Sequence, residues 1–151
     1  MLLTSASAHA IRAMIYLAMQ PERRFCRARE ISEREQIPNP FLWKILRQLR
    51  GHHLLESVRG CGGGYRLGMA PSKIRLSEIV KAVEGDTDFD HCVLHEGRCG
   101  AASKCALHVC LQPVLEQFLS AMENTTLETV SQTRPIGHSS RPSRKRTKRK
   151  A

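Results

Sequence analysis

A glycine-rich run over residues 60–64 (GCGGG) lies between two short segments, residues 54–59 and 64–67, that have the alternation of β-strands. Glycine adopts positive φ angles without steric cost, so it favours tight turns and close approaches of the backbone. The pattern predicts a β-hairpin whose tip approaches another molecule, and the rest of the fold has to be built around that hairpin.

Three segments with apolar residues at helical spacing come before the hairpin: residues 7–19, 28–35 and 39–50. The third has a strong start signal in Asn39-Pro40, because asparagine can cap free amides and proline suits the first helical position. Gly51 ends this third segment. Three helices followed by a hairpin is the element order of a winged helix-turn-helix, so we expect a mainly α fold with a small β-hairpin wing.

The second half of the chain is less regular. Residues 76–83 predict a short amphipathic helix closed by Gly85, and residues 86–109 have little periodicity. A longer helix is expected to begin at Pro113, with one apolar face made of Leu115, Phe118, Leu119, Met122, Leu127 and Val130. The remaining residues, 134–151, are rich in Ser, Arg and Lys, a composition that predicts disorder.

Charge is distributed unevenly along the chain. Residues 1–75 carry 13 Lys and Arg against 5 Asp and Glu, residues 76–133 carry 3 against 9, and residues 134–151 carry 8 against none. A basic front half joined to an acidic back half indicates that the front meets a polyanion. Neutralisation of phosphates drives much of DNA affinity, so double-stranded DNA is the expected partner.

The segment 39–50 has the size and pattern of a helix that fits the DNA major groove, where base edges can be told apart. Its candidates for reading bases or contacting phosphates are Asn39, Trp43, Lys44 and Arg47. In the hairpin, Arg59 is expected at a neighbouring minor groove, and Gly62 and Gly63 let the backbone approach phosphates. The alternative is an ordinary amphipathic surface helix beside a plain turn, with Trp43 partly in the core.

Four of the six cysteines fall within nineteen positions: Cys92, Cys99, Cys105 and Cys110. Structural zinc usually takes C-x2-C pairs, and redox enzymes favour a close C-x-x-C pair; the sequence contains neither. Disulfides are disfavoured in a reduced cytosol. Several thiolates with His108 nearby suit an iron–sulfur cluster, with zinc as the alternative.

Several stretches resemble the Rrf2 family of bacterial transcription regulators, which includes iron–sulfur, nitric-oxide and iron regulators. They are residues 10–18 (AIRAMIYLA), 37–42 (IPNPFL), 57–60 (SVRG), 63–67 (GGYRL) and 76–85 (LSEIVKAVEG). The resemblance covers residue 1 to about residue 130. It implies a homodimeric winged-helix repressor in which the long helix from Pro113 crosses its counterpart.

The same resemblance implies a ligand set. Family members that bind a cluster carry three loop cysteines, which fall here on Cys92, Cys99 and Cys105. The fourth ligand in one branch is a histidine just after the third cysteine, here His108; another branch uses an acid of the partner's first helix. The first helix of this chain has no acidic residue at the corresponding positions. The candidates for the fourth ligand are therefore, in order of preference, His108, Cys110 and the partner's His9. A 2Fe–2S cluster is favoured if His108 ligates, and a 4Fe–4S cluster is possible.

These inferences divide the chain into a winged helix-turn-helix DNA-binding domain (1–85), a cysteine-rich cluster-binding loop (86–112), a dimerisation helix (113–133) and a disordered basic tail (134–151). We expect a redox-, iron- or nitric-oxide-responsive repressor. One alternative is a regulator of the same fold that holds zinc or no metal and senses a small molecule. The other is a small iron–sulfur carrier without a DNA role.

Other classes of protein are less compatible with the sequence. No apolar run approaches the ~18 residues of a membrane span, and the start of the chain lacks the order of a signal peptide, so we expect a bacterial cytoplasmic, nucleoid-associated protein. No pairing of a nucleophile with a base is visible, and the glycine run precedes a strand rather than a helix. An enzyme is therefore not expected.

Overall fold

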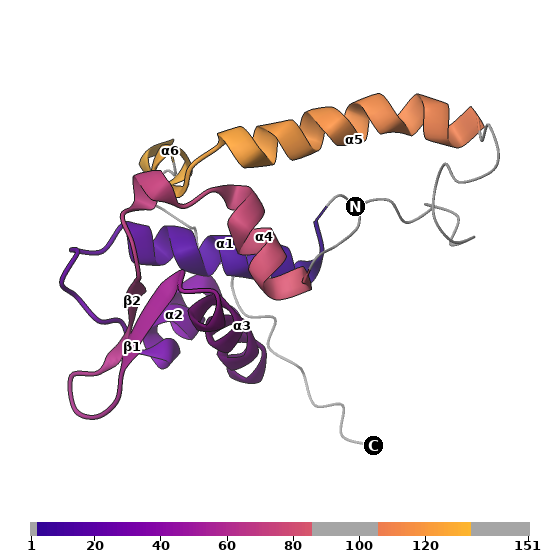
Figure 1. Ribbon diagram of the computed structural model, residues 1–151. Coiled ribbons are helices and arrows are strands. Elements are labelled where there is room, and N and C mark those ends of the chain that lie inside the picture. Colours follow the sequence, from indigo (N-terminus) through magenta and orange to yellow (C-terminus); the bar gives the residue numbers. More distant parts are fainter. Residues whose placement is uncertain (1–2, 86–105, 134–151) are drawn as a thin grey trace, which may run out of the picture.

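The computed structural model describes residues 3–85 and 106–133. In chain order, the elements are α1 (Ser5–Ala18), α2 (Ala28–Glu35), α3 (Asn39–Gly51), β1 (Leu55–Val58), β2 (Gly64–Leu67), the 3-10 helix η1 (Pro71–Lys73), α4 (Leu76–Glu84), α5 (Ala106–Asn124) and α6 (Leu127–Thr133). Helices α1 to α4 form one body with the hairpin at its edge, and α5 extends beyond it (Figure 1). The predicted mainly α fold with a β-hairpin wing is confirmed.

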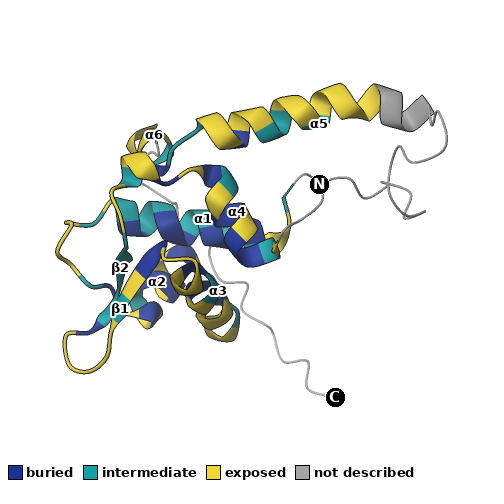
Figure 2. Cartoon of the chain, viewed as in Figure 1, coloured by how far each residue is buried: buried dark blue, intermediate teal, exposed yellow. Residues whose placement is uncertain are grey.

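The core is aliphatic and lies between α1, α3 and α4 (Figure 2). Of the apolar residues expected to form one stripe of α3, Leu42, Ile45, Leu46 and Leu49 are fully buried, and Phe41 is partly buried and packs against the core. Met14 of α1 and Ile79 of α4 are also fully buried. Because the whole stripe of α3 is used for packing, the opposite side of this helix is left for solvent or for a ligand.

The connection between α2 and α3 is a tight turn. Gln36 adopts a left-handed conformation (φ 52°), and the amide of Ile37 donates to the carbonyl of Ser32 at 3.1 Å. The expectation that Asn39 caps α3 was wrong. The Pro38 carbonyl already accepts the first helical hydrogen bonds, so Asn39 is the first helical residue and Pro40 the second.

The hairpin is joined to the helical body through Cys26. Strands β1 and β2 are antiparallel, and Ser57 pairs with Tyr65. On its other edge, Tyr65 exchanges two backbone hydrogen bonds with Cys26, of 2.8 and 2.9 Å. Gly64 has φ +155°, and a Cβ atom there would lie 2.3 Å from the Cys26 carbonyl oxygen. A side chain at position 64 would therefore push the wing away from α2.

The expected start of the long helix at Pro113 was wrong. Helix α5 begins at Ala106 and contains Pro113, so residues 106–112 are helical rather than part of a loop. Proline is common at helix starts, but a helix can also continue past it at the cost of one backbone hydrogen bond. The predicted continuous apolar face is also divided, because the chain leaves the helix after Asn124 and pairs with the segment before α4.

None of the helices described here is both long and apolar enough to cross a membrane.

Candidate nucleic-acid interface

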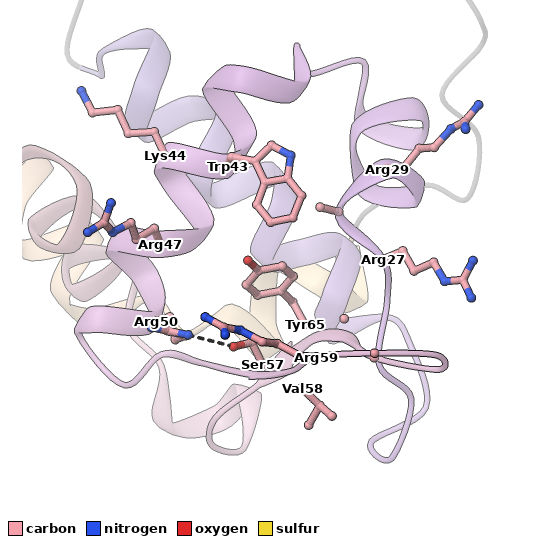
Figure 3. A pocket seen from close by; sticks show the side chains of 14 residues that line it. Arg27, Arg29, Trp43, Lys44, Arg47, Arg50, Ser57, Val58, Arg59 and Tyr65 are labelled. Carbon is pink, nitrogen blue, oxygen red and sulfur yellow. Dashed lines mark hydrogen bonds between the residues drawn. The ribbon is translucent and has the colours of Figure 1, made fainter.

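A concavity with a volume of about 920 Å³ lies between the start of α2, the exposed side of α3 and the hairpin (Figure 3). We call it the basic concavity. Its cationic side chains are Arg27, Arg29, Lys44, Arg47, Arg50 and Arg59. None of the residues that line it is acidic. A surface with this charge attracts a polyanion, and its breadth suits a large ligand.

The exposed side of α3 supplies the centre of the concavity. Lys44, Arg47 and Arg50 are all exposed, because the stripe that alternates with them is buried in the core. Trp43 is 54% exposed, so the alternative that places it partly in the core is wrong. In Figure 3 its ring points into the concavity, with Arg27 and Arg29 on one side and side chains of α3 on the other.

The wing contacts α3 at two places. The Trp43 and Tyr65 rings meet edge to face, with their centroids 6.1 Å apart and their planes at 72°. Nearby, Arg50 Nη1 donates a 3.2 Å hydrogen bond to Ser57 Oγ of β1. These contacts hold the hairpin against α3, so that α3 and the wing present one continuous face.

Backbone geometry sets the shape of the hairpin tip. Gly60 and Gly62 have φ of +99° and +82°, and the Gly63 amide donates to the Gly60 carbonyl at 3.0 Å. A Cβ atom at Gly63 would lie 2.2 Å from the Val58 carbonyl oxygen. Glycine is required at these positions, and Arg59 is left exposed beside the tip.

Most of the DNA-binding residues predicted from the sequence come together in the concavity: Trp43, Lys44, Arg47, Arg59 and Gly63. Asn39, at the start of α3, and Gly62, at the hairpin tip, are exposed but do not line it. Three arginines of the concavity, Arg27, Arg29 and Arg50, were not among the residues predicted to contact DNA. A weak signal existed, since Arg50 follows Arg47 by three positions and so lies on the same helix face.

Carboxylates near the concavity are paired with other groups. Glu30 accepts from Arg24 at 2.6 Å and from the Tyr16 hydroxyl at 2.6 Å. Burial, reinforced by the hydrogen bond to Glu30, holds the pKa of Tyr16 above its usual value. Glu33 lies 2.8 Å from Arg29 in an exposed ion pair, which offsets part of that one positive charge.

The predicted cluster ligands Cys92, Cys99 and Cys105 lie outside the described residues. Position 108 falls in the first turn of α5, and Cys110 is an exposed free cysteine of the same helix. Within residues 3–85 and 106–133, no three His, Cys, Asp or Glu side chains come together as a metal site would require.

Comparison with known proteins gives a consistent result. Residues 3–133 match the family model described as Rrf2, iron-dependent transcriptional regulator. The chain is 34% identical to the HTH-type transcriptional regulator IscR of Klebsiella pneumoniae, over all of this chain and 93% of that one. It is also 34% identical to IscR of Escherichia coli, over 84% of this chain and 78% of the relative.

Solved structures share the fold. The cysteine regulator CymR of B. subtilis aligns with a TM-score of 0.73 and 22% identity, over 86% of this chain and 95% of that one. IscR of T. potens aligns with a TM-score of 0.70 and 21% identity, over 91% of each chain. The match over residues 3–133 and the identity to full-length relatives establish that the chain belongs to the Rrf2 family of transcriptional regulators.

Proposed function

We propose that this regulator binds a promoter operator as a homodimer, and that a cluster held by its cysteine segment controls the binding. The observation that carries the DNA-binding part is the basic concavity beside the exposed side of α3, whose lining includes six cationic residues and no acidic one. Helix α3 enters the major groove, and the wing lies along the neighbouring minor groove. The relatives are transcriptional regulators rather than enzymes.

Each part of the concavity has a separate role in this proposal. Lys44 and Arg47 of α3 face bases or the nearest phosphates, with Asn39 at the entry of the helix. Arg59 reaches into the minor groove, while Gly62 and Gly63 bring the wing backbone close to a phosphate. Arg27, Arg29 and Arg50 contact the flanking phosphates, which sets the register of the protein on the duplex.

A charge-matched pair of variants tests this surface. Arg47→Ala is expected to weaken DNA binding and to lower the slope of log affinity against log salt by about 0.9, the value for one phosphate contact. Arg23→Ala removes the same charge from an exposed position outside the concavity and should leave the slope unchanged. Equal slopes for the two variants, measured by fluorescence anisotropy on a promoter fragment, would contradict the assignment.

Helix α5 supports the homodimer. Phe118 and Met122, in its second half, pack against the core, whereas Leu111 and Val114, in its first half, are 38% and 53% exposed. Apolar side chains at this spacing share one helix face, and a second copy of α5 would cover them. Val114→Glu should dissociate the dimer in sedimentation equilibrium, and Gln112→Glu, on the opposite side of the helix, should not.

The donor set of the cysteine-rich segment 86–112 fits an iron–sulfur cluster, because three thiolates with an imidazole or a fourth thiolate provide four ligands of the kinds that bind iron. The proposed ligands are Cys92, Cys99, Cys105 and His108, with Cys110 as the alternative fourth. Residues two apart on a helix do not face each other, so α5 brings one of positions 108 and 110 to the site, not both. A histidine ligand favours 2Fe–2S, and four thiolates allow 4Fe–4S.

The cluster, when bound, supplies iron–sulfur bonds that oxygen, nitric oxide or iron shortage can break. The contribution of the protein is positional, because the ligating segment connects α4 to α5. Ligation would fix the end of α4 relative to the dimer helix, and thereby the spacing of the two copies of α3. Half-sites lie about one or more helical turns apart, so a small change in that spacing alters operator affinity.

Metal analysis separates this proposal from the zinc alternative. Protein purified without oxygen should be brown and contain near-equal iron and acid-labile sulfide, and Cys92→Ser should lose both. Colourless protein with stoichiometric zinc would favour the same fold with a structural metal. Equal operator affinity with and without the cluster would contradict the switch while leaving DNA binding intact.

We place this regulator in the bacterial cytoplasm, at the nucleoid, where its operators are. The basic residues of 134–151 lie outside the described residues, and we propose that they add sequence-independent DNA affinity. Truncation after Thr133 should lower the salt slope without changing operator preference. An unchanged slope would mean that these charged residues are solvated and do not contribute to DNA binding.

A further inference from the structure

The exposed indole of Trp43 is the one aromatic ring that α3 presents to the basic concavity. It lies one position before Lys44 and four before Arg47, on the flank of α3 beside the buried stripe. More than half of its surface is exposed, although its size would allow it to bury a large apolar area. The ring is therefore available to a ligand in the concavity.

Contacts with the wing restrain the ring. Tyr65 packs edge to face against it, and the backbone of Tyr65 is itself bonded to Cys26 on one side and to β1 on the other. Figure 3 shows the indole above the Tyr65 ring, with Arg29 and Arg27 on one side and Lys44 and Arg47 on the other. A ring restrained in this way loses little conformational freedom when it meets a rigid surface.

The chemistry of indole differs from that of its neighbours. The six cations of the concavity can all bind phosphates or the acceptors of guanine. Indole offers one N–H donor and a broad apolar surface, and the apolar group exposed in the major groove is the 5-methyl group of thymine. An apolar ring surrounded by cations can thus recognise what the cations cannot.

We propose that Trp43 is a specificity-determining residue that reads thymine, with its indole packed against the 5-methyl group of one base in each half-site. This inference rests on the proposed entry of α3 into the major groove. It assigns affinity to the surrounding arginines and lysine, and base discrimination to the indole.

Replacement of thymine by deoxyuridine tests the proposal, because it removes the methyl group alone. The probes are duplexes that the full-length protein enriches from a random-sequence library, with each thymine replaced in turn and affinity measured by fluorescence anisotropy. At one thymine per half-site the wild-type protein should lose about fourfold in affinity, the factor expected for one methyl group withheld from burial. 5-Bromodeoxyuridine should restore the affinity, because bromine fills the volume of the methyl group.

Variants identify the residue responsible. Trp43→Ala should bind more weakly and should no longer distinguish thymine from uracil at that position, whereas Trp43→Phe should retain part of the discrimination. Lys44→Ala should bind both probes more weakly by the same factor. Trp43 is the only tryptophan of the chain, so its fluorescence should also differ between the thymine and bromouracil complexes.

The outcomes that overturn the proposal are distinct. If a sequence is enriched but every uracil duplex binds the wild-type protein as tightly as its thymine parent, Trp43 does not read the methyl group. If Trp43→Ala keeps the discrimination, another residue reads it. If no sequence is enriched over random DNA, the proposed operator binding fails, and the role of Trp43 fails with it.

Discussion

The side-chain nitrogen of Gln48 donates a 3.1 Å hydrogen bond to the backbone carbonyl of Val83. Gln48 belongs to α3, the helix proposed to enter the major groove, and Val83 lies in the last turn of α4, three residues before the cysteine-rich segment 86–112 begins. At the same end of α4, Glu84 accepts hydrogen bonds from the hydroxyls of Thr4 and Ser7, at the start of α1. The end of α4 is thus tied to both α3 and α1.

The hydrogen bond between Gln48 and Val83 predicts a variant that still binds its operator but responds less to the cluster. Gln48→Ala removes the donor and should lower the free energy of unfolding by about 1 kcal/mol. Because α3 then moves more independently of α4, the ratio of operator affinities with and without the cluster should approach one. Gln112→Ala, which removes an exposed hydrogen bond to Glu116 within α5, is the control. An unchanged affinity ratio in Gln48→Ala would exclude this contact as a route of coupling.

Replacement of glycine by alanine should have opposite effects on the free energy of unfolding at positions 64 and 51. Gly64→Ala adds a Cβ atom 2.3 Å from the Cys26 carbonyl oxygen at a positive φ, and should lower the free energy of unfolding by about 1–3 kcal/mol. Gly51→Ala, at the end of α3, meets nothing within 4 Å and should raise it by about 0.5 kcal/mol. Urea unfolding measures both, and equal stabilities would contradict the geometry of the wing.

Local sequence patterns were enough to predict the body of the fold. The spacing of Leu42, Ile45, Leu46 and Leu49 fixes which side of α3 is buried, because a helix repeats every 3.6 residues and the core needs that stripe. The glycine run likewise marks the hairpin. Helix ends were harder to predict in detail. Helix α3 begins at Asn39 as expected, but Pro38 takes the capping position, and α5 begins at Ala106 although Pro113 carries a start signal.

The full extent of the site depended on tertiary structure. Arg27 and Arg29 lie before and within α2, and they reach the concavity only because Cys26 pairs with Tyr65 and thereby places the wing beside them. No pattern within one helix encodes that contact. The position of Trp43 also depended on tertiary structure. Its place beside the apolar stripe of α3 was compatible with a buried or an exposed side chain, and the packing of α3 leaves it exposed.

Two cysteines of the winged domain should react at different rates. Burial raises the pKa of the Cys26 thiol and leaves it without access to solvent, whereas Cys61 is exposed at the tip of the wing. Because the thiolate is the nucleophile, iodoacetamide at neutral pH should alkylate Cys61 well before Cys26. Peptide mass spectrometry over time measures both rates, and urea should make them similar. Native Cys26 reacting as fast as Cys61 would contradict its burial.

A half-buried imidazole predicts the response of stability to acid. The Nδ1 atom of His9 is buried and has no hydrogen-bond partner among the described residues, and its ring packs edge to face on Phe41 of α3, with centroids 5.5 Å apart. Burial, and secondarily the charge of Arg12, hold the pKa of His9 below its usual value of 6.5. The folded protein therefore binds a proton at this site less readily than the unfolded chain does.

The sign of the effect follows from proton linkage. Well above pH 6.5 both states hold a neutral His9, so the site contributes no pH dependence there. As the pH falls below 6.5 the unfolded state takes up the proton first, and the free energy of unfolding should decrease until the folded pKa is passed. His9→Leu keeps an apolar contact with Phe41 and should flatten the profile between pH 7 and 5, whereas His52→Gln, at an exposed position, should retain the decline. Urea unfolding across this range decides the matter, because an equally steep profile in His9→Leu would assign the acid sensitivity to another group.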